Sequence, residues 1–444
     1  MSDIKFIEKE TGLGRIRGLE REDDLAFLGI RYAKAERFSY AVPVVKWEGT
    51  YDATHFGDAC TQYRTYFPHL DVPERLFYHR EFREGLNFTY SEDCLNLNIY
   101  APKDAENAPV LVFIHGGGFN SMANSEGYLD GAGYAKRGII LVCINYRVGA
   151  FGYLTHEEIQ EENGRDGNFG LDDILVAIKW VKRHIASFGG DAENITAMGQ
   201  SAGAISLQYL CLSQKAEGLF KRAIMLSGGG LFPKKARPKP ATETREYWKE
   251  VMKIAGVKTL EEFRHLDEKE VMAAVEVIKT ERNDNLVNTQ PVVDGYLLEK
   301  DTAQLVKHPL RIDYMAGTTS NDMFNVVLYH MAWKFIRENK GYRYFFDIDA
   351  PGDDNGAFHS SDLRYFFGTL DKSFRPYGEK DKAASELIMD YVAAFVRTGN
   401  PNGEGRPIWK KGGKPLYISK GGFRMKRANN PVLLIRNTFR GDPK

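Results

Sequence analysis

The sequence predicts an α/β fold with a mostly parallel central sheet flanked by helices. Short continuous apolar runs at 110–114, 139–144 and 223–226 are typical of parallel strands that are buried on both faces. Between the second and third runs, residues 171–187 place apolar side chains on one face at helical spacing. This alternation of buried strands and a helix is the basis of the predicted class.

The remaining elements follow in chain order. The N-terminal third supplies antiparallel strands ahead of the first buried run. Three more strands are expected at 194–198, 312–316 and 344–348, and a helix is expected at 204–210. Residues 231–288 are charged and helical, and they are interpreted as a cap insertion. We therefore expect one domain over 1–444, with the cap at 231–288 inside it.

Composition limits the function classes. With 444 residues and 43% hydrophobic content, the chain can bury a large core. Lys+Arg and Asp+Glu are both 60, so nothing favours a nucleic-acid or anionic-membrane partner. The N-terminus lacks the apolar core of a signal peptide, and no run approaches membrane-spanning length. A cytoplasmic protein is expected.

A possible nucleophile stands out at Gly199–Gly203, which fits G-x-S-x-G. The expected strand at 194–198 precedes this motif and the expected helix at 204–210 follows it. A serine on such a tight turn is held away from the backbone above a helix N-terminus, and flanking glycines avoid clashes. The context predicts that Ser201 is a nucleophile.

A serine nucleophile also needs donors for the oxyanion that forms. The buried run at 110–114 opens into His115–Phe119, which contains three successive glycines. A flexible turn is the alternative interpretation, but the position after a core strand matches the oxyanion loop of α/β-hydrolases. The expected donors are the N–H groups of Gly117, Gly118 and Ala202.

Further motifs extend along nearly the whole chain. Residues Ser91–Tyr100 (SEDCLNLNIY) resemble the second signature of the type-B carboxylesterases, the cholinesterase-like family. Other segments similar to that family are FLGIRYA at 27–33, NYRVG at 145–149, FGGD at 188–191, PVVDG at 291–295 and RTGNPN at 397–402. The resemblance implies an α/β-hydrolase fold that hydrolyses esters without a cofactor or metal.

The family pattern implies the other two members of a catalytic triad. Asp322 follows the strand expected at 312–316, although the family more often has Glu there and Gly where this chain has Met323. His359 lies in a glycine-containing loop after the strand at 344–348. The order Ser, acid, His is that of α/β-hydrolases.

Each of these assignments has rivals. His115 precedes the oxyanion glycines, and a loop-orienting role is favoured for it over a catalytic one. Three acidic residues compete with Asp322 as the partner of His359, namely Asp353, Asp354 and Asp362.

The resemblance also implies several structural pairs. Glu92 would pair with Arg37, and Asp172 with Arg147, as buried scaffold ion pairs. Cys60 and Cys94 match a pair that the family commonly joins as a disulfide; in a reducing compartment two nearby thiols are expected instead. The other two cysteines, Cys143 and Cys211, are expected in the core.

Two departures from the family bear on substrate choice. Gln200 replaces the usual Glu beside the nucleophile, which removes a negative charge near the catalytic histidine. Asp322 and His359 are 359 − 322 = 37 positions apart, a shorter insertion than the family usually carries, so the helical cap is shortened and the cleft is expected to be open. Trp333 and Phe335 would form an apolar wall or simply pack a helix.

The sequence thus predicts a serine hydrolase that cleaves small-molecule carboxylic esters through an acyl-enzyme. Two alternatives stay open at this point. The same triad could act on amides or carbonates, or the chain could be a non-catalytic, cholinesterase-like binding protein.

Overall fold

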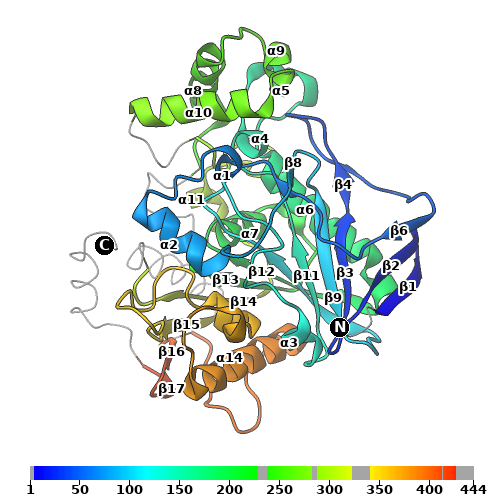
Figure 1. Ribbon diagram of the computed structural model, residues 1–444, viewed down its shortest axis with the longest axis vertical. Coiled ribbons are helices and arrows are strands. Elements are labelled where there is room, and N and C mark those ends of the chain that lie inside the picture. Colours follow the sequence, from blue (N-terminus) through cyan, green and yellow to red (C-terminus); the bar gives the residue numbers. More distant parts are fainter. Residues whose placement is uncertain (1–4, 229–237, 283–287, 323–340, 413, 427–444) are drawn as a thin grey trace.

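A large mixed sheet forms the centre of the protein (Figure 1). The computed structural model describes residues 5–228, 238–282, 288–322, 341–412 and 414–426. Within these residues the strand order is β1-β2-β3-β9-β11-β10-β12-β13-β14-β15-β16-β17, and β6 pairs with β2. The strands are β1 Lys5–Thr11, β2 Gly14–Glu20, β3 Leu25–Arg31, β6 Thr50–Asp52, β9 Asn96–Ala101, β10 Ala108–Ile114, β11 Ile140–Ile144, β12 Gly190–Gln200, β13 Arg222–Leu226, β14 Asp313–Thr319, β15 Tyr342–Asp347, β16 Leu416–Ser419 and β17 Gly422–Met425.

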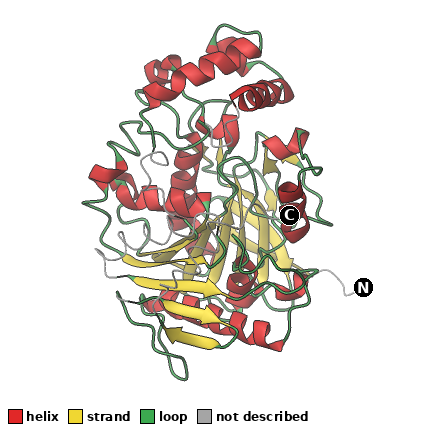
Figure 2. Cartoon of the chain, turned by 90° about the vertical axis from the view of Figure 1, so that its left-hand side faces the viewer, coloured by secondary structure: helices red, strands yellow, loops and turns green. Residues whose placement is uncertain are grey.

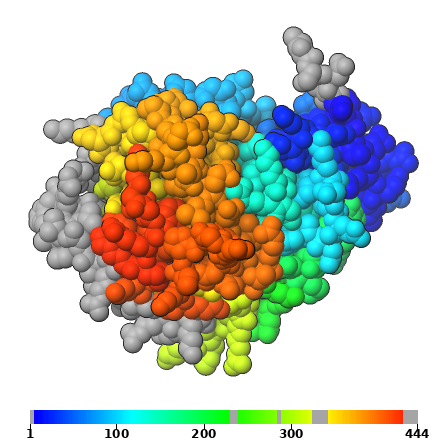
Figure 3. Space-filling model, turned by 90° about the horizontal axis from the view of Figure 1, so that it is seen from below, coloured from blue at the N-terminus to red at the C-terminus, as the bar shows by residue number. Residues whose placement is uncertain are grey.

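The middle of the sheet is parallel and its ends are antiparallel. Every neighbouring pair from β11 to β16 is parallel, and the other pairs along the strand order are antiparallel. Strand β6, outside this order, pairs parallel with β2. The sheet twists through the molecule between helices on both sides (Figure 2). Its two ends lie far apart in Figure 3, with the N-terminal strands in dark blue and the C-terminal strands in red. The predicted α/β class is confirmed.

Helices cover both faces of the sheet. The helices are α1 Tyr63–Tyr66, α2 Pro73–Phe82, α3 Ala132–Ala135, α4 Gly149–Tyr153, α5 Glu157–Asn163, α6 Phe169–His184, α7 Ala202–Leu212, α8 Ala241–Ile254, α9 Leu260–Arg264, α10 Glu268–Arg282, α11 Thr302–Leu305, α13 Leu363–Phe367 and α14 Glu379–Thr398. Helices α6 and α7 pack on one face, and α3 and α14 contact the other.

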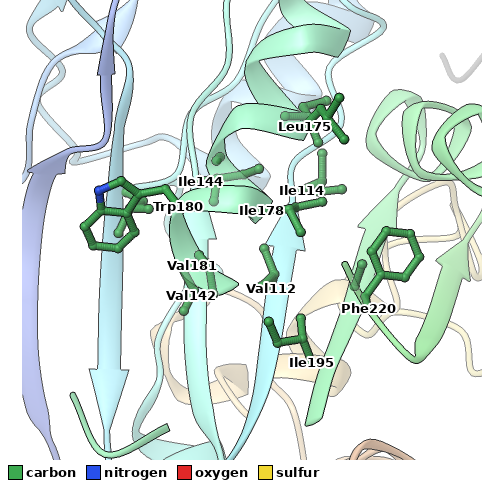
Figure 4. Packing of buried hydrophobic residues seen from close by; sticks show 14 of the residues in the cluster. Val112, Ile114, Val142, Ile144, Leu175, Ile178, Trp180, Val181, Ile195 and Phe220 are labelled. Carbon is green, nitrogen blue, oxygen red and sulfur yellow. The ribbon is translucent and has the colours of Figure 1, made fainter. Parts of the chain in front are cut away.

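The alternation of side chains along β10 explains this layering. Val112 and Ile114 join the core cluster under α6, whose Ile178 lies against them in Figure 4. The intervening Leu111 and Phe113 belong to the second cluster, on the α14 side. Successive residues of a strand point to opposite faces, so a continuous apolar run is what a strand between two helical layers requires.

The helix expected at 171–187 is α6, and it ends earlier than predicted. After His184 the chain tightens into a 3₁₀ turn over Ile185–Phe188, and Gly189 adopts a φ of 86°. A glycine with positive φ ends a helix without the steric penalty that a side chain would add.

The charged segment after β13 contains α8, α9 and α10, which lie together at the top of Figure 1 beside α4 and α5. Trp248, Phe263 and Ile278 of these helices share a buried cluster with Phe151 of α4. Residues 229–237 and 283–287, which the expected cap range partly includes, lie outside the described residues.

Of the two ion pairs that the family resemblance implied, one is confirmed and the other is wrong. Arg37 pairs with Glu92 as expected, but Arg147 binds Asp173 rather than Asp172, at 2.7 Å from Nη2 to Oδ1. Asp172 pairs instead with Arg165, at 2.9 Å. Adjacent residues of α6 point about 100° apart, so the two carboxylates serve different partners.

The cysteines also separate into two kinds. Cys60 and Cys94 form a disulfide, whereas Cys143 and Cys211 are buried as free thiols in β11 and α7. Among the described residues, no helix is long and apolar enough to cross a membrane.

Candidate functional site

Ser201 occupies the sharp turn between β12 and α7. β12 ends at Gln200 and α7 begins at Ala202, so a single residue makes the connection. Ser201 has φ 52° and ψ −123°, a conformation that non-glycine residues rarely adopt and that often marks functional sites. Its N–H donates to the carbonyl oxygen of Leu226 at 2.9 Å, which ties the turn to β13.

The glycines around this turn are required by close packing. A Cβ on Gly199 would lie 2.5 Å from the carbonyl oxygen of Gly203, and one on Gly203 would collide with that of Ile114. A Cβ on Gly116 would lie 2.6 Å from Oε1 of Gln200 and 2.9 Å from Cβ of Ser201. The loop after β10 and the serine turn can therefore meet only if no side chain separates them.

The structure brings Ser201, His359 and Asp322 together in one hydrogen-bonded chain. Nε2 of His359 is 3.0 Å from Oγ of Ser201, and Nδ1 is 2.9 Å from Oδ2 of Asp322. The Asp322 side chain is fully buried, and that of His359 is 13% exposed. These distances allow a proton to move from the serine to the ring while the acid holds the other nitrogen.

The loops that carry the acid and the histidine are joined directly. The N–H of Asn321 donates to the carbonyl oxygen of Ala357 at 2.9 Å, and its amide side chain donates to that of Asn355 at 2.6 Å. Both loops leave the same edge of the sheet, since β14 and β15 are parallel neighbours. Thr318 also donates its hydroxyl to Oδ2 of Asp322 at 3.3 Å.

The rival acids of the sequence analysis have other partners. Asp353 accepts from Nη2 of Arg375 at 2.6 Å, and Asp354 is exposed. Asp362 is fully buried and accepts from the Tyr344 hydroxyl at 3.1 Å. Asp322 is the acid whose oxygen lies within hydrogen-bond distance of His359.

Charge around His359 favours the protonated ring. Burial lowers its pKa, but the negative charge and hydrogen bond of Asp322, with a further contribution from Asp362, outweigh burial and raise the pKa above its ordinary value of 6.5. Burial raises the pKa of Asp362 to about 6, against the hydrogen bond of Tyr344. A ring of this kind accepts a proton more readily than an ordinary histidine.

The glycine loop presents free backbone donors. Gly117 and Gly118 have φ of 96° and 61°, and the space beside Gly118 is open. The Gly117 carbonyl accepts from the N–H of Asn120 at 3.0 Å, which fixes the turn. Among the described residues, the N–H groups of Gly117, Gly118 and Ala202 have no hydrogen-bond acceptor.

His115 serves the loop differently. Its ring is buried, stacks on Tyr146 at a centroid distance of 4.4 Å, and donates from Nδ1 to the carbonyl oxygen of Gly116 at 3.0 Å. Burial lowers its pKa to about 4, so the ring is neutral at neutral pH. This environment fits the loop-orienting role favoured for it from the sequence.

Gln200 contacts the catalytic loop through its amide. Its Nε2 donates to the Ser360 hydroxyl at 2.7 Å and lies 3.3 Å from Nε2 of His359. Sequence reasoning singled out Gln200, but it missed Ser360 and also Tyr78, whose hydroxyl donates to the carbonyl oxygen of His359 at 3.4 Å. No motif marks these two residues, since their roles come from contacts across the fold.

Some expectations concern residues that the structure does not describe. Met323, Trp333 and Phe335 lie outside the described residues, so the expected open cleft stays a prediction. Among the described residues, no cluster of His, Cys, Asp or Glu could hold a metal ion.

Comparison with known proteins adds independent information. The sequence model of the carboxylesterase family matches residues 6–340 and 323–427. The para-nitrobenzyl esterase of Bacillus subtilis (strain 168) is 28% identical over 465 residues, covering 89% of this chain and 90% of that protein. The fumonisin B1 esterase of Sphingopyxis macrogoltabida is 37% identical over 237 residues, but covers only 51% of this chain and 41% of that protein.

Solved structures show the same fold. A PNB esterase superposes with a TM-score of 0.83 at 24% identity, covering 98% of this chain and 99% of that one. An esterase from anaerobic Clostridium hathewayi, described as able to hydrolyse aliphatic aromatic polyesters, has the same TM-score at 22% identity, covering 98% and 99% of the two chains.

Proposed function

This chain belongs to the carboxylesterase family and is a serine hydrolase that cleaves carboxylic esters, and we propose that Ser201, His359 and Asp322 are its catalytic triad. The observation that carries the assignment is the hydrogen-bonded chain from the Ser201 hydroxyl through His359 to Asp322. The proposed oxyanion donors are the N–H groups of Gly117, Gly118 and Ala202.

In the proposed mechanism, Nε2 of His359 takes the proton of the Ser201 hydroxyl as its oxygen attacks the ester carbonyl carbon. The electron pair of the carbonyl moves onto its oxygen, where the backbone donors of the glycine loop stabilise the charge. Asp322 keeps the ring in the tautomer that accepts at Nε2 and stabilises the imidazolium.

Collapse of the tetrahedral intermediate breaks the bond to the alcohol, which leaves with the proton from His359. The acyl group then remains on Ser201 until water, deprotonated by the same nitrogen, attacks it. The acid leaves and the serine regains its proton. One ester and one water give one acid and one alcohol, with no cofactor in the balance.

Removal of the nucleophile tests this assignment. Ser201→Ala should lower kcat/KM toward a chromogenic ester by about 10³ or more, because no other group in the triad can form the acyl-enzyme. An irreversible serine-reactive phosphonate should label the wild type at Ser201 and leave the variant unlabelled. Labelling of another serine, or substantial activity in the pure variant, would overturn the triad.

The substrate range is proposed on narrower grounds. The relative from Bacillus subtilis is named for para-nitrobenzyl esters, so we propose esters with an aryl or benzyl group as first substrates. The shortened segment between Asp322 and His359 supports a cleft that tolerates bulky groups. A steep fall in kcat/KM from acetate to branched or long acyl esters would contradict this.

The alternatives weighed from the sequence are not favoured. The relatives found are named esterases or lipases, which speaks against both an amidase and a non-catalytic binding protein.

We also propose that residues 231–288 form a cap inside a single domain, 1–444, supported by the grouping of α8–α10. Activity of a variant in which a short linker replaces 238–282 would show whether the cap shapes substrate choice.

Location stays a proposal. The cytoplasmic location expected from the sequence is weakened by the disulfide between Cys60 and Cys94, since such bonds persist mainly in oxidising compartments. Mass spectrometry of the protein from its native cells, with free thiols blocked at lysis, would report which state occurs.

A further inference from the structure

A cavity of about 240 Å³ lies between α1, α2 and the turn that follows α2. Its lining residues all lie between positions 64 and 90, within the segment that the Cys60–Cys94 disulfide closes. The volume is many times the roughly 10–15 Å³ that one water needs on this measure. The cavity can therefore hold a small molecule.

Three arginines, Arg64, Arg75 and Arg83, line this cavity together with His79. Arg83 is already neutralised, because its Nε lies 2.9 and 3.0 Å from the two carboxylate oxygens of the buried Glu126. This charge-assisted contact offsets one positive charge, and Nη1 of Arg83 donates to the Tyr90 hydroxyl at 3.1 Å.

The other two arginines lack such a partner. Among the described residues, no carboxylate lies within 4.0 Å of Arg64 or Arg75. Nη1 of Arg75 donates to the carbonyl oxygen of Phe67 at 3.4 Å, and its guanidinium lies over the ring of Tyr63 at 5.0 Å. A carbonyl and a ring hold an arginine in place but do not cancel its charge.

The acidic group on the neighbouring helix is already engaged. Glu276 of α10 lies 3.7 Å from Nε2 of His69 and 3.7 Å from Nζ of Lys279. Burial and then the charge of Arg83 lower the pKa of Arg64 to about 10. The charge of Glu126 offsets part of this effect on Arg64, but neither Arg64 nor Arg75 contacts a carboxylate among the described residues. Their two guanidinium groups repel each other at one cavity, and an anion between them relieves that repulsion.

The rest of the lining is mixed, with Asn87 and Tyr90 as its polar members. Leu70, Leu86 and Phe88 complete the wall beside the arginines. We propose that this cavity binds a small organic anion whose carboxylate or phosphoryl oxygens contact Arg64 and Arg75, while its apolar part lies against Leu70, Leu86 and Phe88.

This anion site is separate from the triad. Arg75 and His79 are four residues apart on α2 and share the face toward the cavity. None of Ser201, His359 and Asp322 lines the cavity. Helix α2 meets the His359 loop through other side chains: the Tyr78 hydroxyl contacts the carbonyl oxygen of His359, and Phe77 packs edge-on against Phe358. The proposal therefore adds a ligand site that ester hydrolysis does not need.

Binding is tested with phthalate, phenyl phosphate and inorganic phosphate, at constant ionic strength set with NaCl. The measurements are isothermal titration calorimetry and the midpoint of thermal unfolding of the full chain. A ligand that binds only the folded state raises this midpoint, visibly at concentrations well above Kd. Comparison of phthalate with phenyl phosphate shows whether the site prefers carboxylate or phosphoryl oxygens. Comparison of phenyl phosphate with inorganic phosphate shows how much the apolar wall contributes to the affinity.

The variants are Arg64→Gln and Arg75→Gln, with Arg80→Gln as the matched control, because Arg80 lies on α2, is exposed and does not line the cavity. We expect both cavity variants to bind at least about tenfold more weakly, a loss typical of one charge-assisted contact. The control should bind as the wild type does. Arg64→Gln should also raise the unfolding midpoint without ligand, since it removes an uncompensated charge.

Two results would overturn the proposal. One is the absence of saturable binding to the wild type by any of the three probes. The other is equal weakening in the Arg80 control, which would show general charge attraction rather than a site. Unchanged binding in both cavity variants would place the ligand elsewhere and would reject the site as well.

Discussion

His115 and His359 stand beside the same serine turn, and their environments give them opposite properties. His115 packs on Tyr146, no carboxylate among the described residues contacts its ring, and burial lowers its pKa to about 4. His359 is largely buried, but Asp322 contacts its Nδ1 and Asp362 adds charge, so its pKa is raised. Burial alone makes a neutral structural histidine; burial against a carboxylate makes a base.

The largest expected difference in activity is between the variants that replace each of these two histidines with alanine. His359→Ala should lower kcat/KM for a neutral ester by about 10³ or more, because the serine then lacks its base. His115→Ala should cost far less, about tenfold, through looser positioning of the glycine loop. Steady-state kinetics on folded proteins check this, with circular dichroism as the control for folding. Equal losses in both variants would erase the distinction between the two rings.

The acid provides the next test. Asp322→Asn should lower kcat by at least about a hundredfold, since an amide can hold the wrong imidazole tautomer. The matched control is Asp353→Asn, whose carboxylate binds Arg375 outside the triad and should leave kcat close to wild type. If the two variants lost activity equally, Asp322 would not be the partner of His359 in catalysis.

Sequence predicted the parts of this site that depend on local patterns. The serine turn and the glycine loop could be predicted from the sequence because close backbone contacts require glycine at Gly116, Gly199 and Gly203. The sheet was readable because its central strands are buried on both faces.

Contacts between residues that are brought together by the fold could not be predicted from the sequence. The choice of Asp173 over Asp172 as the partner of Arg147 depends on the direction in which each side chain leaves α6. Asp362 was named from the sequence as a rival partner of His359, but only the fold shows that it accepts from Tyr344 while Asp322 contacts the ring. The cavity of Arg64 and Arg75 is lined by residues spread from position 64 to 90, and it has no sequence motif.

The pH dependence sharpens the comparison further. The proposed mechanism requires a neutral His359. Its pKa lies above 6.5, so kcat/KM should fall as the pH drops through that raised value. Asp362→Asn removes one of the charges that raise this pKa. The acid limb, which is the part of the pH profile where kcat/KM falls with falling pH, should therefore move to lower pH. The Tyr344 hydroxyl can still donate to the amide oxygen, which keeps the contact. A limb that stays in place, or moves up, would show that Asp362 does not act on His359.

The smallest effect concerns Gln200, whose amide nitrogen lies 3.3 Å from Nε2 of His359 and donates to Ser360 at 2.7 Å. Gln200→Glu would add a negative charge next to the ring on the side opposite Asp322. The pKa of His359 should rise, and the acid limb should move to higher pH, while the rate above the limb changes by less than about tenfold.

Gln200→Met separates charge from contact in this last test. This variant keeps the length of the side chain, removes the amide and adds no charge. Any decrease in kcat/KM that it causes therefore measures the contribution of the hydrogen bond to Ser360. We expect its acid limb to stay near that of the wild type, in contrast to Gln200→Glu. The full pH profile of kcat/KM for all three proteins checks this. If both variants moved the limb equally, packing around the ring rather than charge would set the pKa of His359, and the contrast with His115 would need another cause.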